Sequence, residues 1–163
     1  MIRTILTACL AALLLVGFLG EPALAKKSLD ELAGEILQEL QEFYPVRSTS
    51  MGIHTHDFKL ADYSSGSVKS MRKNLIDFQQ EIYRFRNANL STDDRIRYSL
   101  LKANLDIALL DLDKIEWHER LPQLYVDEAV NGVYYLMISE HAPLAERLIS
   151  IMGRMKAVPS LFE

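Results

Sequence analysis

Apolar residues recur three or four positions apart along most of this chain, the spacing of one face of an α-helix. The first such stripe occupies residues 29–43. It follows Ser28-Leu29-Asp30-Glu31, a capping-box pattern with Ser28 as the N-cap and Glu31 as the third helical residue. Pro45 ends the stripe. The sequence therefore predicts a first helix between Ser28 and Pro45.

Four further helices are expected from the same spacing. The stripe over residues 68–85 alternates steps of three and four, as in a helix packed against an antiparallel partner. The helix expected over residues 91–115 is apolar on two faces. Such a helix is normally buried between neighbours, so we expect it at the centre. A fourth stripe spans residues 126–138, and a fifth lies between Pro143, in its first turn, and Pro159, where it stops.

The chain between Pro45 and Ser67 breaks this pattern, because it shows no helical period and is rich in Ser, Thr, Gly, His and Asp. Loops longer than about fifteen residues are uncommon in compact domains and often carry function. The apolar residues of the segment favour a loop anchored on the protein body, with disorder as the competing explanation; they are Met51, Ile53, Phe58, Leu60 and Tyr63. Since no segment alternates with period two, we predict an all-α fold of antiparallel helical hairpins, with about five helices and one long irregular loop.

Residues 1–25 have the features of a cleaved signal peptide. Arg3 supplies a positive charge, residues 5–19 form an apolar run, and Ala23-Leu24-Ala25 is a small-residue cleavage site. The run of about fifteen residues is shorter than the roughly twenty that cross a bilayer, which argues against an uncleaved anchor. We therefore expect an exported protein, periplasmic or secreted. Its mature chain would span residues 26–163, without stable insertion in a membrane.

The single cysteine, Cys9, lies within the apolar run. Leu6-Thr7-Ala8-Cys9 looks like a lipoprotein acceptor, but too few apolar residues precede it, so we expect Cys9 to be removed with the signal. A cysteine-free mature chain suits an oxidising compartment. The formal net charge of −4 lacks the basic surface that nucleic-acid binding requires, which excludes that class of partner.

The irregular segment begins a string of short pieces that continues toward the end of the chain. The pieces are Pro45-Val46, Thr49-Ser50-Met51-Gly52-Ile53-His54, Asp57, Leu60, Asp62, Ser64, Leu90-Ser91, Trp117, Pro122 with Tyr125, Ala142-Pro143 with Arg147, and Arg154 with Val158-Pro159. In this order and spacing, the chain from about Leu29 onward resembles the opening part of a bacterial domain of unknown function, family 885.

Members of that family look like exported, mostly helical, zinc-peptidase-like proteins that are much longer than this chain, with a His-Glu-x-x-His segment in a later half. The resemblance implies zinc for the full-length family. Here the nearest approach, His118-Glu119-Arg120-Leu121-Pro122, places a proline where the second ligand would stand. We therefore expect no catalytic residue, metal ligand or cofactor in this chain. Residues 26–163 would be the N-terminal helical part of a larger domain, with the missing C-terminal half as partner.

His54, His56 and Asp57 form the densest group of potential ligands. Alternating histidines beside a carboxylate are compatible with a metal site. Alternatively, His54 caps a turn at Gly52 and Asp57 satisfies loop amides. Because His54 and Asp57 match the family string, we assign these two residues to a substrate cleft formed with the missing half, and neither to a metal.

Arg147 and Arg154 lie seven residues apart on one helix face. They would either hold a carboxylate or phosphate or pair with acidic neighbours on a solvated surface. His141, just before Ala142-Pro143, is expected at a helix junction.

Two functions remain open. In the first, the chain is the N-terminal helical part of an exported metallohydrolase of peptides, inactive by itself. In the second, it is a free-standing periplasmic helical module that binds a partner or small ligand without catalysis. The second would require a closed core and no large exposed apolar patch.

Overall fold

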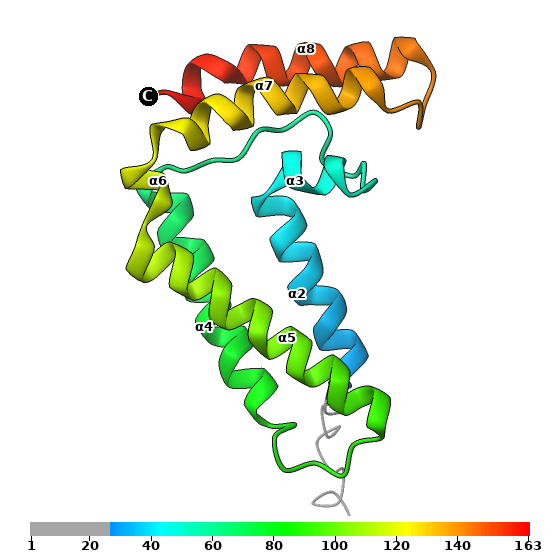
Figure 1. Ribbon diagram of the computed structural model, residues 1–163, viewed down its shortest axis with the longest axis vertical. Coiled ribbons are helices and arrows are strands. Elements are labelled where there is room, and N and C mark those ends of the chain that lie inside the picture. Colours follow the sequence, from blue (N-terminus) through cyan, green and yellow to red (C-terminus); the bar gives the residue numbers. More distant parts are fainter. Residues whose placement is uncertain (1–26) are drawn as a thin grey trace, which may run out of the picture.

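The computed structural model describes residues 27–163, and all regular structure in that range is helical (Figure 1), which confirms the predicted fold class. The five longer helices are α2 (Leu29–Phe43), α4 (Ser65–Tyr83), α5 (Thr92–Leu110), α7 (Pro122–Ile138) and α8 (Leu144–Leu161). None of the helices in this range combines the length and apolarity that a bilayer span requires. The expected signal peptide, its cleavage site and Cys9 lie outside the described residues.

Helices α2, α4 and α5 surround the main hydrophobic core. The capping box of α2 is present: Ser28 Oγ accepts from the Glu31 N–H at 3.2 Å, and the Glu31 carboxylate accepts from the Ser28 N–H at 2.7 Å. Helices α4 and α5 form an antiparallel hairpin, and α2 packs against both. Leu32, Leu75 and Leu105, one from each helix, expose no surface.

Helix α5 differs from the prediction of a central helix. Leu101 and Leu105 are buried, because α2 and α4 cover that face. On the second apolar face, however, Ile96, Leu100 and Ile107 are 57%, 60% and 58% exposed. The helix therefore lies at the surface of the described structure, and its second face has no packing partner among residues 27–163.

The end of α5 widens into one π-helical turn, η2 (Asp111–Ile115). The Glu116 N–H donates to the Asp111 carbonyl at 2.8 Å, and Glu116 itself has a left-handed backbone with φ 55°. Arg72 of α4 holds the turn, because its Nη2 donates to the Leu112 carbonyl at 3.2 Å. The short helix α6 (Trp117–Arg120) then leads the chain into α7.

Helices α7 and α8 form a second antiparallel hairpin, which lies across one end of the group formed by α2, α4 and α5 (Figure 1). Pro143 is the N-cap of α8 and does not lie within its first turn. Pro159 does not stop α8, which continues to Leu161. Its helical φ fits, and its missing N–H costs one hydrogen bond close to the helix end.

The segment predicted as a loop from Pro45 begins instead with a short helix, α3 (Pro45–Ser50). Its proline occupies the first turn, and Ser48 Oγ donates to the Gln41 and Tyr44 carbonyls at 3.2 and 3.0 Å. Residues 51–64 are irregular and run beside α7 (Figure 1).

The apolar anchors expected for this irregular segment from the sequence are present in part: Tyr63 packs against the main core, and Leu60 lies next to Gly132. Met51 and Phe58 are both exposed. Instead, Asp57 and Ala61 are buried, and the Ala61 N–H donates to Glu128 of α7 at 2.7 Å. Polar contacts with α7 therefore fix the segment together with these apolar ones.

Gly132 lies where α7 approaches α3 and the irregular segment. A Cβ atom at this position would lie 2.8 Å from Leu60 Cδ2 and 3.2 Å from Val46 Cγ2. We expect Gly132→Ala to lower the free energy of unfolding by about 1–3 kcal/mol through overpacking.

Gly34, in the exposed part of α2, is the matched control, because a Cβ there meets no atom within 4 Å. Gly34→Ala should raise the free energy of unfolding by about 0.5–1 kcal/mol. Urea denaturation measures both changes, and two changes of the same sign would contradict the predicted close approach.

Candidate functional site

The candidate site is built around Arg154 of α8, whose side chain is completely buried. Its Nε donates to the Lys59 carbonyl at 2.9 Å, and its Nη1 donates to the Gly132 carbonyl at 2.6 Å. Its Nη2 donates to Thr49 Oγ1 at 2.6 Å and, more weakly, to the Pro45 carbonyl at 3.4 Å. One guanidinium thus joins α8 to α7, α3 and the irregular segment.

Arg147 and Arg154 both lie in α8, seven residues apart as expected, but the interpretation that they pair with acidic neighbours on a solvated surface is wrong. Arg147 donates to the Leu136, Met137 and Ala142 carbonyls, so it closes the end of α7. Arg154 is buried among carbonyl groups. Among residues 27–163, neither guanidinium is paired with a carboxylate on a solvated face.

Asp57 of the irregular segment is the buried carboxylate closest to Arg154. Its Oδ1 accepts a hydrogen bond from Thr49 Oγ1 at 2.7 Å and lies 3.9 Å from Arg154 Nη2. Burial lowers the pKa of the Arg154 guanidinium, whereas the charges of Asp57 and Glu128 raise it. The two carboxyl groups thus offset part of the cost of burying the cation.

The other carboxylate oxygen of Asp57 faces two imidazoles. His54 Nδ1 lies 2.8 Å from Asp57 Oδ2, and His141 Nε2 lies 3.1 Å from the same atom. The two rings are stacked, with centroids 3.4 Å apart and planes 5° from parallel. The structure therefore brings His54 and Asp57 together, and adds a third residue to them.

His141 is that third residue, and sequence reasoning did not connect it with the other two. It lies at the junction of α7 and α8, as predicted, but its packing against His54 depends on how that hairpin meets the irregular segment. The sequence signal that pointed to the region of His141 was the match of Ala142-Pro143 and Arg147, just beyond it, to the family string. His56, in contrast, does not belong to the group.

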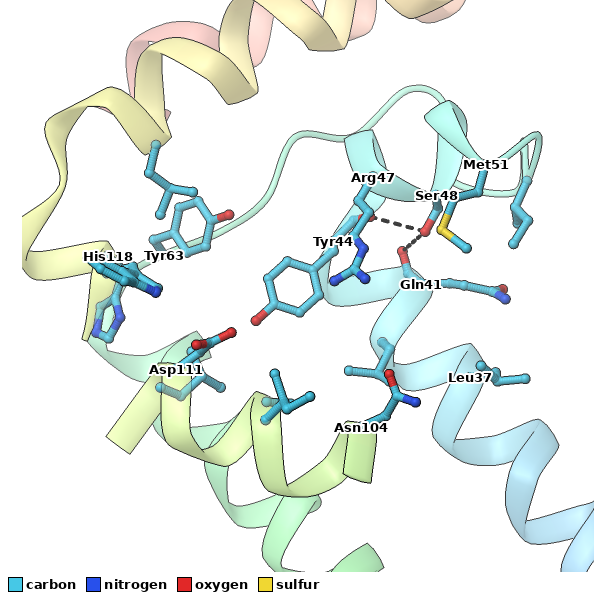
Figure 2. Close-up of a pocket in the computed structure, with 17 residues that line it drawn as sticks. Leu37, Gln41, Tyr44, Arg47, Ser48, Met51, Tyr63, Asn104, Asp111 and His118 are labelled. Atoms are coloured by element: carbon cyan, nitrogen blue, oxygen red, sulfur yellow. Dashed lines mark hydrogen bonds between the residues drawn. The ribbon is translucent and has the colours of Figure 1, made fainter. Parts of the chain in front are cut away.

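A second feature is an apolar cavity of about 580 Å³ between α2 and α3 on one side and α5 and η2 on the other (Figure 2). Its apolar lining consists of Leu37, Leu40, Met51, Ile53, Ile107, Ala108, Leu112, Trp117 and Leu124. Its polar lining consists of Gln41, Tyr44, Arg47, Ser48, Tyr63, Asn104, Asp111 and His118. His54 and Asp57 are not among these residues.

Tyr44 extends into the cavity, with its hydroxyl group directed toward Asp111 (Figure 2). Burial raises the pKa of Tyr44 to about 12, with a further contribution from the charge of Asp111 and a smaller, opposite one from Arg47. Tyr44 is therefore a neutral hydrogen-bonding group at neutral pH and not a base.

Replacement of Arg154 tests its role as the central cross-link. Arg154→Met keeps an unbranched side chain but leaves Asp57 without its nearby positive charge and the Lys59 and Gly132 carbonyls without their donor, so we expect a loss of about 3–5 kcal/mol in unfolding free energy. Lys156→Met, at an exposed position of the same helix, should change it by no more than about 0.5 kcal/mol. Thermal or urea unfolding checks both variants, and equal effects would exclude the cross-linking role.

Glu128 makes stability depend on pH. Burial raises the pKa of its carboxyl group above the ordinary 4.5, against the opposing effects of the Ala61 N–H and Arg154. Ionisation of Glu128 therefore opposes folding, and its stabilising contribution is lost as the pH rises from 4.5 through the raised value. Glu128→Gln cannot ionise, so its unfolding free energy relative to wild type should increase between pH 4 and pH 7. A pH-independent difference in urea denaturation would contradict this.

Residues 45–163 match the sequence profile of a family described as bacterial protein of unknown function (DUF885). No curated protein and no solved structure matches the chain. The matched range extends from α3 through α8, so it includes Arg154 and Asp57 together with His54 and His141. It agrees with the resemblance carried by the string from Pro45 to Pro159. The chain belongs to the DUF885 family of bacterial proteins.

Proposed function

We propose that this chain forms the substrate-binding wall of an exported hydrolase of peptides, whose catalytic zinc centre is supplied by polypeptide outside these helices. The observation that carries the proposal is the apolar cavity of about 580 Å³. Its size is within the roughly 300–1,000 Å³ of typical small-molecule sites. The class of reaction comes from the resemblance of the sequence to zinc-peptidase-like proteins, and export comes from the signal-peptide features of residues 1–25.

The polar groups of the cavity support a peptide as its occupant. Arg47 of α3 and Asp111 of η2 line it from different elements. A short peptide offers a carboxylate to the first and an amide or ammonium group to the second. Its apolar side chains would contact the aliphatic wall. The cavity would thus bind a substrate without contributing a reacting group.

Exposed apolar side chains outside the core support the proposal that a further polypeptide packs against this chain. On α7, Val130 and Met137 are 60% and 63% exposed, and on α8, Ile149 is 65% exposed. The second face of α5 adds Ile96 and Leu100. Exposed apolar side chains in such number are typical of faces that another segment covers. This observation favours a part of a larger enzyme over a free-standing binding module.

Trp117 allows the proposed binding to be measured directly, because it is the single tryptophan of the chain and lines the cavity. We expect trileucine, but not triglycine, to produce a saturable change in its fluorescence. Ile107→Glu places a charge in the apolar wall and should weaken binding by about tenfold or more.

Ile96→Glu is the matched control, since Ile96 lies on the same helix, is equally exposed and does not line the cavity. An absent signal, or the same loss in both variants, would overturn peptide binding. The purified protein should leave a fluorogenic peptide intact, and cleavage that depends on its own side chains would overturn the assignment of catalysis elsewhere. A monomer that melts cooperatively and binds no hydrophobic dye would favour the alternative module.

A further inference from the structure

We propose that His54, Asp57 and His141 form a binding site for one divalent transition-metal ion of the zinc and cobalt class. Each side chain offers one ligand atom, and the three atoms lie within 4.8 Å of one another. Two of the residues belong to the irregular segment and the third to the turn between α7 and α8. An ion at this point would link the irregular segment to the turn between α7 and α8, which lie far apart in the sequence.

The three ligand atoms lie close together. His54 Nδ1 and His141 Nε2 both face Asp57 Oδ2, at hydrogen-bonding distances of 2.8 and 3.1 Å. Zinc ligands lie about 2.0–2.2 Å from the metal, so an ion takes the place of the two imidazole protons. The rings are nearly parallel and must turn apart to direct both nitrogen lone pairs at the ion. Both histidines lie outside helices, so this rotation does not require a helix to break.

The surroundings hold the carboxylate in a suitable orientation. Thr49 Oγ1 donates to Asp57 Oδ1 at 2.7 Å, and Arg154 lies on the same side of the carboxylate. Oδ2 is thereby left for the imidazoles. His141 Nδ1 lies 3.2 Å from Ser139 Oγ, a contact that orients the second ring. Outer contacts of this kind position metal ligands and strengthen binding.

The donor set selects the class of ion. Two imidazole nitrogens and one carboxylate suit zinc, cobalt, nickel and copper, whereas calcium and magnesium prefer oxygen ligands alone. The imidazole side chains of His54 and His141 are 24% and 19% exposed, so solvent reaches the cluster. A water molecule can therefore complete four-coordinate geometry, and the ion can exchange with solution.

Zinc titration of the untagged protein, followed by calorimetry, tests the site, because a polyhistidine tag would bind the same ions. We expect one zinc ion per chain and no response to calcium or magnesium. His54→Gln and His141→Gln should each weaken binding by at least about tenfold. The chain has four histidines, and the other two provide matched controls: His56→Gln and His118→Gln should retain wild-type affinity.

Two further measurements separate metal ligation from a structural role of the cluster. Cobalt should give a visible absorption band with the wild-type protein and with both control variants, but not with His54→Gln or His141→Gln. Zinc should raise the melting temperature in the same pattern, because an ion that binds the folded state stabilises it. Failure of the wild-type protein to bind zinc, or unchanged binding in both ligand variants, would overturn the site. The titration requires no peptide and no cavity, so its result is independent of the peptide-binding test.

Discussion

Burying a guanidinium is costly unless its N–H groups are paired and its charge is balanced, and this constraint governs how the second hairpin meets the rest of the protein. Arg154 satisfies it with acceptors on α3, α7 and the irregular segment. The short helix α3 places Pro45 and Thr49 within its reach. Gly132 has no side chain, which allows the backbone of α7 to approach. These elements are therefore positioned together, and a change in one alters the others.

The same constraint explains the candidate site. The buried charge of Arg154 is stabilised by a nearby anion, and the carboxylate of Asp57, itself buried, provides it. One carboxylate oxygen is then occupied by Thr49, whereas the other needs donors from elsewhere. His54 and His141 provide them. The group that we propose as a metal site is thus continuous with the contacts that stabilise the fold, so its chemistry and the stability of the hairpin are linked.

Local patterns in the sequence were sufficient to predict the five longer helices, because caps and apolar stripes depend on residues that are close in the chain. Ser28 caps α2, as its pattern predicted, and Ser91 caps α5. Helix α3 was missed because six residues are too few to show a period. The burial of Arg154 was missed because its spacing also fits a solvated face. The meeting of Asp57 with His141 depends on tertiary packing, which no local pattern encodes. The match of His54 and Asp57 to the family string identified two members of the cluster, but not their neighbour.

The π turn after α5 determines how the hairpin of α4 and α5 is oriented relative to α6 and α7. A π turn accommodates one more residue than an α-helical turn, so it offsets every later residue by roughly 100° around the helix axis. Loss of one residue within 111–115 would restore an ordinary helix, but it would rotate the residues that follow, among them Trp117 and His118 of the cavity lining, away from their present positions. The extra residue therefore sets the rotation, about the helix axis, of the segment that leads to α7 relative to the hairpin of α4 and α5.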